Sequence, residues 1–300
     1  QRKMLGRLLR VVVHQVKYGI ILNNLIEVKV GDYKELEFTP DVFGCIVQYP
    51  NNSGNIEDYR EFTERAHAAG CKVAVDADIM SLALLVPPGE WGADIVFGGT
   101  QRLGIPMFYG GPSAAYFATR DEYKRNIPGR IIGLSKDKYG KICYRMALQT
   151  REQHIKREKA TSNICTAQAL LATMAGFYAV YHGAEGIKDI AKRIHSIANW
   201  LNKQLLRLGY IERNSLFFDT LRLGLPDHVS AQKLRTIALS KEVNLRYFEN
   251  GDVGFSIDEA TTVADANLLL MIFGIAESLL AFLLAGKLAA GGCKLGVAVD

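Results

Sequence analysis

This 300-residue sequence is poor in cysteine, and its few cysteines are scattered. The 5 cysteines include no Cys-x-x-Cys pair, and an odd, widely spaced set argues against a disulfide framework or a zinc site. The 6 histidines show no metal-ligand spacing either. We therefore expect buried thiols in a reducing compartment and no metal. The cysteines are Cys45, Cys71, Cys143, Cys165 and Cys293.

The sequence also lacks the local signatures of several protein classes. Near the C-terminal end, the longest uncharged run, Ser278–Gly286, is far too short to cross a membrane. The segment Arg2–Val13 does not resemble a signal peptide. There is no Gly-x-Gly-x-x-Gly or Walker pattern, no nucleophile elbow and no Cys/His pair spaced for thiol catalysis. These absences argue against a membrane protein, a nucleotide-binding protein and a serine or thiol hydrolase.

Positive charge is present, and it is concentrated in one segment. Residues 120–159 contain twelve Lys or Arg and five acids, a balance of +7, whereas the whole chain carries +5. A solvated basic surface, a phosphate-bearing ligand and an acidic protein partner all fit this segment. Nucleic acid fits least, because the segment lacks regularly interleaved aromatic residues and any recognition motif.

The first half of the chain has the pattern of a parallel α/β domain. Gly44–Tyr49 and Cys71–Val75 are short apolar runs typical of buried strands. Between them, Asn55 can cap a helix that runs to about Ala69, with Gly70 as its end. This order predicts a right-handed parallel unit. Two more strands are expected at Asp94–Gly98 and Ala114–Thr119.

The second half begins with helices and then becomes mixed. Apolar residues at three-to-four spacing predict one helix from Ile164 to Gly183 and another from Ile187 to Leu208. Further strands are expected at Phe217–Leu223, Val243–Phe248 and Val253–Ile257, and further helices at Val229–Leu239 and Asp258–Phe273.

These elements predict an α/β fold with two parts. Residues 28–155 form part of a large parallel-sheet domain, and residues 156–273 form a linking helix and a smaller α+β domain. The ends, 1–27 and 274–300, are atypical, and the chain begins with Gln1. We expect it to be a fragment of a longer protein.

Two carboxylates occupy a position where α/β sheets bind ligands. Asp76 and Asp78 follow the strand at Cys71–Val75, and ligands bind at the carboxyl ends of such strands. A carboxylate there can accept a hydrogen bond from the protonated ring nitrogen of pyridoxal phosphate. It can equally cap the next helix without any ligand.

A second candidate site lies at the predicted start of the helix near residue 164. Thr161, Ser162 and Asn163 provide hydroxyls and amides that can hold a phosphate at a helix N-terminus, beside basic residues of the same segment. Simple capping explains the same residues. The glycine-rich loop from Gly98 to Pro112 permits close backbone approach, but by itself it is weak support for a ligand.

Several runs of this sequence resemble glycine decarboxylase, the P-protein of the glycine cleavage system. The similarity extends from about Glu27 to Phe273 and matches the amino-terminal half of that family. The runs are residues 148–171, Val47–Pro50, Pro87–Asp94, Gln101–Arg102, Tyr109–Pro112, Pro128–Arg130 and Asp258–Thr262. The resemblance implies the fold of pyridoxal-phosphate enzymes of the aspartate-aminotransferase type (fold type I).

The resemblance also implies a reaction. In that family glycine loses its carboxylate as carbon dioxide on pyridoxal phosphate, and the aminomethyl group passes to the lipoyl arm of H-protein. The cofactor is held by a Schiff-base lysine in the carboxyl-terminal half. Here Arg102 occupies the matching position, and a guanidinium stays protonated and cannot form the imine. This half therefore resembles a non-catalytic copy in which Asp76 and Asp78 keep a vestigial ring-nitrogen position.

A related turn gives this half a role. Cysteine desulfurases carry a Gly-Thr-x-Asn turn whose threonine binds the cofactor phosphate of a neighbouring active site. Ala160–Asn163 resembles it, so Thr161, Asn163 and Ser162 are the expected cross-dimer phosphate contacts. Alanine replaces the glycine, which is a departure from that pattern. The basic loop expected beside them, facing a partner, contains Arg151, His154, Lys156, Arg157 and Lys159.

The partners implied by the resemblance are the carboxyl-terminal catalytic half or subunit, which binds pyridoxal phosphate covalently, and the lipoyl-bearing H-protein. The assembly would be a homodimer or a heterotetramer, in a bacterial cytoplasm or, in a eukaryote, the mitochondrial matrix. A purely structural or regulatory pseudo-enzyme half is the alternative. An independent pyridoxal-phosphate enzyme would need a lysine near position 102, and the nearest downstream is Lys124.

Overall fold

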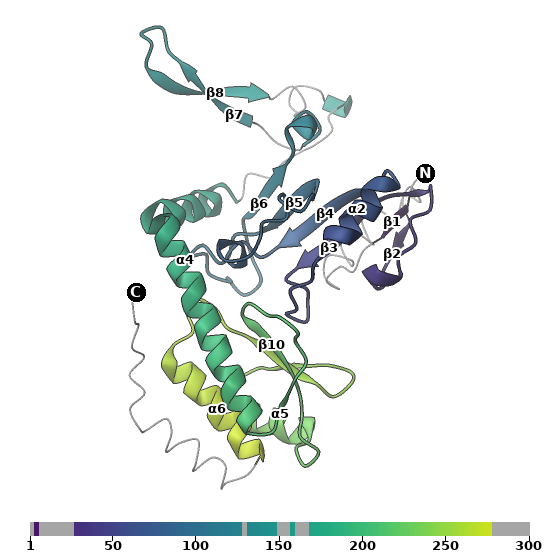
Figure 1. Cartoon of the computed structure of the whole chain (residues 1–300). Coiled ribbons are helices and arrows are strands. Elements are labelled where there is room, and N and C mark those ends of the chain that lie inside the picture. The colour runs from purple at the N-terminus through teal and green to yellow at the C-terminus, as the bar shows by residue number, and fades with distance from the viewer. Residues whose placement is uncertain (1–2, 6–26, 128–130, 149–156, 160–167, 278–300) are drawn as a thin grey trace.

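The computed structural model describes residues 3–5, 27–127, 131–148, 157–159 and 168–277. They form a larger body built on a six-stranded sheet and a smaller body built on a four-stranded sheet (Figure 1). The long helix α4 (Ala169–Arg207) runs along one side of the molecule from the first body to the second (Figure 1). Among the described residues, every helix is too short or too polar to traverse a lipid bilayer.

The larger sheet has the strand order β2-β1-β3-β4-β5-β6. All neighbouring pairs are parallel except β5 and β6. Its central strands carry Val47, Val73 and Val75 fully inside the core, as expected for a parallel sheet. The strands predicted in this region are confirmed, with ends that differ by one or two residues. The strands are β1 (Lys3–Leu5), β2 (Val28–Lys29), β3 (Val42–Tyr49), β4 (Lys72–Ala77), β5 (Ile95–Gly99) and β6 (Ala115–Thr119).

Helix α2 (Arg60–Ala68) covers one face of this sheet. Its Phe62 and Ala66 are buried in the same hydrophobic cluster as the strand residues. The cluster also contains Cys45 and Cys71, which are buried free thiols as expected, and burial raises the pKa of Cys45 to about 12.

The predicted start of this helix at Asn55 is wrong. The helix begins at Arg60, and Asn55 instead contacts the smaller body. Its Oδ1 accepts a hydrogen bond from the Ser215 N–H (3.1 Å), and its backbone forms an antiparallel bridge with Phe217. A side chain with good capping chemistry is thus used for a contact about 160 residues away, which local pattern does not reveal.

The smaller body packs an antiparallel sheet, in the order β11-β12-β10-β9, against helices. Leu221 and Leu223 of the sheet are buried together with Leu201 and Leu205 of α4 and with Phe273. All three strands predicted in this region are present and shorter than predicted. The elements are β9 (Ile211–Glu212), β10 (Thr220–Gly224), α5 (Ala231–Ser240), β11 (Arg246–Tyr247), β12 (Val253–Ser256) and α6 (Val263–Glu277).

Helix α4 consists of two helical segments that meet at Gly183. That residue has a φ of 65° and a ψ of −178°, which no α-helix adopts. The predicted break at Gly183 and the predicted end near Leu208 are therefore confirmed. Residues 164–167 of the predicted first helix lie outside the described residues.

A loop of the larger body joins it to the smaller one. In this loop, residues 51–56, the Ile56 N–H donates to the Leu216 carbonyl (2.9 Å) and the Ser53 carbonyl accepts from Asn214 Nδ2 (2.8 Å). Gly54 has a φ of 87°, and a Cβ there would lie 2.4 Å from the Thr220 carbonyl oxygen. Only glycine therefore allows this approach.

A hairpin of β7 (Ile131–Lys136) and β8 (Ile142–Leu148) projects from the larger body (Figure 1). The sequence prediction did not include it. It occupies the middle of the basic segment, and Lys136, Lys138 and Lys141 are exposed at its tip. The short 3-10 helices are η1 (Tyr33–Glu35), η2 (Ser81–Ala83), η3 (Asp121–Tyr123) and η4 (Arg157–Lys159).

Candidate functional site

The carboxyl ends of β4 and β5 lie side by side and face the smaller body. Asp76 is the penultimate residue of β4, Asp78 follows that strand, and Arg102 lies on the loop after β5. The structure therefore brings together the two carboxylates and the arginine that the sequence singled out. This is the edge at which open α/β sheets bind ligands.

Arg102 forms the centre of an ion cluster that crosses the two bodies. Its guanidinium binds Asp78 in a fork, with Nε–Oδ1 and Nη2–Oδ2 distances both 3.2 Å. Nη2 also pairs with Asp219, just before β10, and Nη1 lies 3.4 Å from the Ile257 carbonyl and 3.6 Å from Glu259 Oε2. One side chain thus holds the carboxyl ends of the large sheet's strands against one end of the small sheet, where the start of β10 lies beside the end of β12.

The cluster contains more acid than base, and burial sharpens the imbalance. One guanidinium faces three carboxylates in a region shielded from water. Burial raises the pKa of Asp219 and of Glu259 above their ordinary values, although Arg102 opposes this. Burial also disfavours the charged form of Arg102, but Asp78, Asp219 and Glu259 outweigh that and raise its pKa. Arg102 is therefore permanently charged, while burial favours the neutral forms of Asp219 and Glu259.

Asp78 fulfils the capping role that its position allowed, and it does so while it binds Arg102. Its Oδ2 accepts from the Ser81 N–H (3.1 Å) at the start of η2, and Ser81 Oγ donates to the Asp78 carbonyl (2.8 Å). Asp76 lies next to it and is half-buried, and burial together with the charge of Asp78 raises the pKa of Asp76.

Tyr116 of β6 covers the same edge of the sheet. Its hydroxyl donates to the Ala77 carbonyl (2.8 Å), so the side chain crosses over β5 to reach β4. Gly98 makes this crossing possible, because a Cβ there would lie 2.2 Å from the Ala77 oxygen and 2.9 Å from the Tyr116 ring. The first of the loop's glycines, Gly98, is therefore explained by packing.

The described residues around Arg102 do not fit a covalently held pyridoxal phosphate. Lys124 is exposed and pairs with Asp121 at 2.7 Å on η3. Lys72 lies at the amino end of β4, 3.7 Å from Asp94, whereas the cluster lies at the carboxyl ends of the strands. Neither lysine reaches the cluster, and the guanidinium that is there cannot form an imine.

The other predicted site residues are only partly described. Thr161, Ser162, Asn163, Arg151, His154 and Lys156 lie outside the described residues, so their roles stay predictions. Arg157 and Lys159 are in η4, where Arg157 is exposed and has a φ of 51°. The structure therefore neither brings these residues to the Arg102 cluster nor separates them from it.

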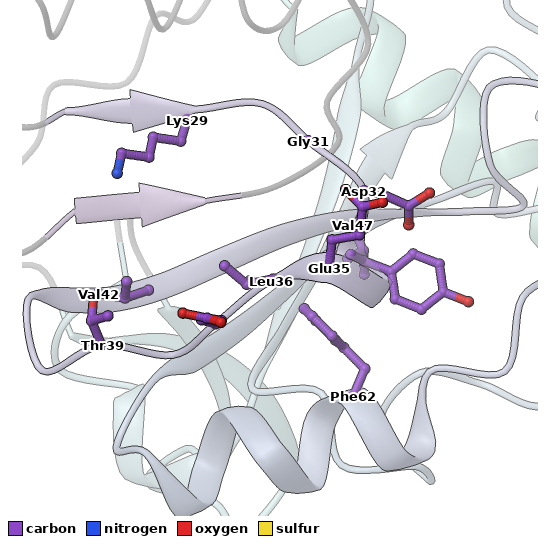
Figure 2. Close-up of a pocket in the computed structure, with 11 residues that line it drawn as sticks. Lys29, Gly31, Asp32, Glu35, Leu36, Thr39, Val42, Val47 and Phe62 are labelled. Carbon is purple, nitrogen blue, oxygen red and sulfur yellow. The ribbon is translucent and has the colours of Figure 1, made fainter.

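A hollow at the other edge of the large sheet is a poor candidate for the same chemistry. It has a volume of about 360 Å³ and lies between β2, η1 and α2, lined by Phe62 and Val47 among others (Figure 2). Its charged lining consists of Asp32, Glu35 and Glu37 against the single ammonium of Lys29. A net negative hollow repels phosphate and carboxylate ligands.

Two members of the cluster were missed by sequence reasoning. Asp219 was placed inside a predicted strand, and Glu259 was noted only as part of the run Asp258–Thr262. A signal for Glu259 did exist, because that run opens a helix with more acid than capping requires. In the structure Thr262 and Asp265 cap α6 reciprocally, with Thr262 N to Asp265 Oδ2 at 2.8 Å and Asp265 N to Thr262 Oγ1 at 3.2 Å. Glu259 is thus free for Arg102.

Comparison with known protein sequences gives a consistent result. The model of the glycine cleavage system P-protein family matches residues 6–273. Glycine dehydrogenase (decarboxylating) of Bacteroides thetaiotaomicron is 77% identical over 251 residues, which are 84% of this chain and 26% of that protein. The mitochondrial glycine dehydrogenase (decarboxylating) of Dictyostelium discoideum is 52% identical, over 82% of this chain and 24% of that protein. The chain thus spans about a quarter of the length of these relatives.

Comparison with solved structures confirms the predicted fold. An inhibitor-bound crystal structure of glycine decarboxylase (P-protein) of the glycine cleavage system is 28% identical with a TM-score of 0.79, over 91% of this chain and 65% of that chain. An aspartate aminotransferase from Thermus thermophilus is 13% identical with a TM-score of 0.60, over 92% and 78%. The fold is that of pyridoxal-phosphate enzymes of the aspartate-aminotransferase type.

Replacing Arg102 should destabilise the chain in a pH-dependent way. Arg102→Met keeps the stem and removes the charge, leaving buried carboxylates uncompensated, a loss of about 3–5 kcal/mol. Asp219 and Glu259 have raised pKa values in the folded state, so their protonation favours folding at low pH and this contribution is lost as pH rises through those values. We therefore expect a smaller loss at about pH 5 than at about pH 8.

Urea unfolding of the chain at both pH values measures this effect. Arg207→Met is the matched control, because Arg207 is exposed and, among the described residues, its side chain hydrogen-bonds only to Gln204 in the same helix. Equal losses for the two variants, or a loss for Arg102→Met that does not change with pH, would contradict the cluster's stabilising role.

Proposed function

Because this chain belongs to the glycine cleavage system P-protein family, we propose that it is part of the amino-terminal half of a glycine decarboxylase. The complete protein catalyses pyridoxal-phosphate-dependent decarboxylation of glycine and transfers the aminomethyl group to the lipoyl arm of H-protein. In this proposal the present half forms no covalent bond to the cofactor. It packs against the catalytic half and helps to complete that half's active site.

The observation that carries this proposal is the state of Arg102. The side chain at the family's lysine position is engaged with Asp78, Asp219 and Glu259, and no proton can be removed from it at usable pH. A lysine in that place could lose its proton and attack a carbonyl, whereas this guanidinium serves only as an ion-pair partner. Chemistry therefore has to come from residues outside this chain.

The proposed contribution of this half to catalysis is a phosphate contact. Pyridoxal phosphate supplies the electron sink for decarboxylation when it is bound by the other half. Thr161 and Asn163 would hold its phosphate, with the amides and dipole of the following helix favouring the anion. Ser162 and the basic loop (Arg151, His154, Lys156, Arg157, Lys159) would add hydrogen bonds and positive charge.

The hairpin supports a second contact, with the lipoyl-bearing H-protein. Its tip presents Lys136, Lys138 and Lys141 to solvent, away from both bodies (Figure 1). A projecting basic tip steers an acidic partner before contact is made. We place the assembly, a homodimer of complete chains or a heterotetramer of two subunit types, in the bacterial cytoplasm, or in the mitochondrial matrix if the source is eukaryotic.

The alternative is that this half is purely structural or regulatory. The Arg102 cluster favours this alternative, because its ion pairs fix the two bodies to each other. The two proposals differ only in whether Thr161 and Asn163 touch the partner's cofactor.

No Schiff base should form on this chain. Borohydride treatment of the chain with pyridoxal phosphate, followed by peptide mapping, should find no specific pyridoxyl-lysine, because Arg102 cannot form the imine. A stoichiometric adduct at a single lysine, Lys124 for example, would sink the proposal of a non-catalytic half.

Loss of the Thr161 hydroxyl should weaken cofactor retention in the complete assembly. A charge-assisted hydrogen bond to phosphate contributes about 1.5–3 kcal/mol, so Thr161→Ala should raise the cofactor's dissociation constant roughly ten- to a hundredfold. Thr173→Ala is the control, since its hydroxyl donates to the Ala169 carbonyl of α4 at 3.0 Å. If Thr161→Ala leaves cofactor retention unchanged and lowers only the free energy of unfolding, by about 1 kcal/mol of capping energy, the structural alternative holds.

Charge reversal at the hairpin tip should slow association with the carrier protein. Lys136→Glu, Lys138→Glu and Lys141→Glu together should lower the association rate and flatten its dependence on salt, because exposed charges act over about 8 Å at physiological ionic strength. The same change at three exposed lysines of the smaller body's elements, Lys203, Lys233 and Lys241, should have less effect. Stopped-flow kinetics at several salt concentrations that do not distinguish the two triple variants would leave only a solvated surface.

A further inference from the structure

The first segment of α4 carries no charge at all. Residues 169–183 contain no Asp, Glu, Lys or Arg, whereas the second segment, residues 184–207, contains seven of them. A helix that is apolar all round is normally buried on all sides. The first segment is not.

Only one stripe of this segment is covered by the described part of the chain. Leu171 and Ala175 are buried against the larger body, and the Tyr178 ring lies so close to Gly104 that a Cβ there would be 2.7 Å from it. These three residues follow the three-to-four spacing of a single helix face.

A second apolar stripe lies beside the first and is exposed. It consists of Leu170, Met174, Phe177 and Tyr181, with exposed fractions of 69%, 36%, 71% and 85%. Their spacing of four, three and four residues puts all four on one face, the pattern of a helix that packs against another helix. Two aromatic rings, a leucine and a methionine also match the residues enriched at interface centres.

The second segment of the same helix serves as an internal comparison. There the apolar side chains Ile194, Leu201 and Leu205 are fully buried, and the exposed positions carry charges such as Lys188 and Lys192. One helix thus has a finished surface after Gly183 and an uncovered apolar surface before it. The two segments differ in their content of charged residues, so we expect a packing partner on the first segment and not on the second.

We propose that this second stripe is the contact through which the chain packs against an apolar helix of the remaining part of the P-protein. The inference rests on the proposed function. About three quarters of the length of the Bacteroides relative has no counterpart in this chain. In that relative, the matched quarter and the remaining three quarters belong to one polypeptide. A segment tethered in the same polypeptide acts at an effective concentration in the millimolar range. It therefore outcompetes a second copy of this chain for the stripe.

Hydroxyl-radical footprinting of the full-length protein tests this contact. Met174, Phe177 and Tyr181 should be labelled roughly tenfold more slowly than Ile211 and Leu216, after correction for intrinsic reactivity, because residues at an interface centre keep little accessible surface. Ile211 and Leu216 are the controls, since they are exposed apolar residues of the smaller body (50% and 63%). Protection should persist on dilution. Labelling of the stripe at the controls' rate would overturn the inference, and protection lost on dilution would assign the stripe to a second copy and overturn it too.

Substitution provides an independent readout. Phe177→Glu in the full-length protein should expose the stripe to labelling, because the contact would otherwise have to bury an unpaired charge. Loss of the contact should lower the melting temperature by more than about 5 °C. Leu216→Glu should change neither. A freely labelled stripe in a protein that still decarboxylates glycine would remove this inference and leave the proposed function intact. A protected stripe together with unchanged cofactor retention in Thr161→Ala would support this inference and contradict the proposed phosphate contact.

Discussion

The ion cluster around Arg102 is the interaction on which the arrangement of the two bodies depends. Its guanidinium joins the carboxyl edge of the large sheet, through Asp78, to Asp219 and the Ile257 carbonyl of the small sheet. Few other groups could do this, because only a planar fork donates in three directions while it stays charged when buried. A lysine in the same place would supply one compact charge and would lose its proton more readily. The permanent charge of the guanidinium, which prevents imine formation, therefore also allows Arg102 to hold the ion cluster together.

The pattern in the sequence predicted what depends on neighbours along the chain. Val47, Val73 and Val75 lie in runs whose burial follows from composition alone, and Gly183 breaks its helix because no other residue adopts a φ of 65° without strain. Asn55 and Asp219 behaved differently. Both have side chains that suit local capping or strand ends, and both are engaged by residues more than a hundred positions away. Chemistry alone does not distinguish these uses, since tertiary contact decides between them.

The hairpin β7–β8 and the candidate site show the same limit from another side. The hairpin has no buried apolar face that a sequence pattern could reveal, since Ile132 and Leu134 are more than half exposed in the described chain. For the site, the sequence placed Asp76 and Asp78 at the carboxyl end of a parallel strand, and the resemblance singled out Arg102. The pairing of β4 with β5 in the structure brings the three residues together. The sequence did not predict that Asp78 would be fully engaged by Arg102, which requires the smaller body to be in place. Thr161 and Asn163 stay predictions.

Helix α4 connects the ion cluster around Arg102 to the exposed apolar stripe of its first segment. After Gly183, Arg193 donates to the Glu259 carbonyl (3.1 Å) and the Thr261 carbonyl (2.6 Å), so the turn that carries Glu259 is fixed by the second segment. Before Gly183, the Tyr178 hydroxyl is close enough to the Glu259 carboxylate for burial and that charge to raise its pKa. The second segment thus fixes the backbone of Glu259, and the charge of that residue acts on Tyr178 of the first segment. A partner helix seated on the neighbouring stripe would press on Tyr178 from its other side, and the two bodies would be held in register by the same contact that attaches them to the rest of the protein.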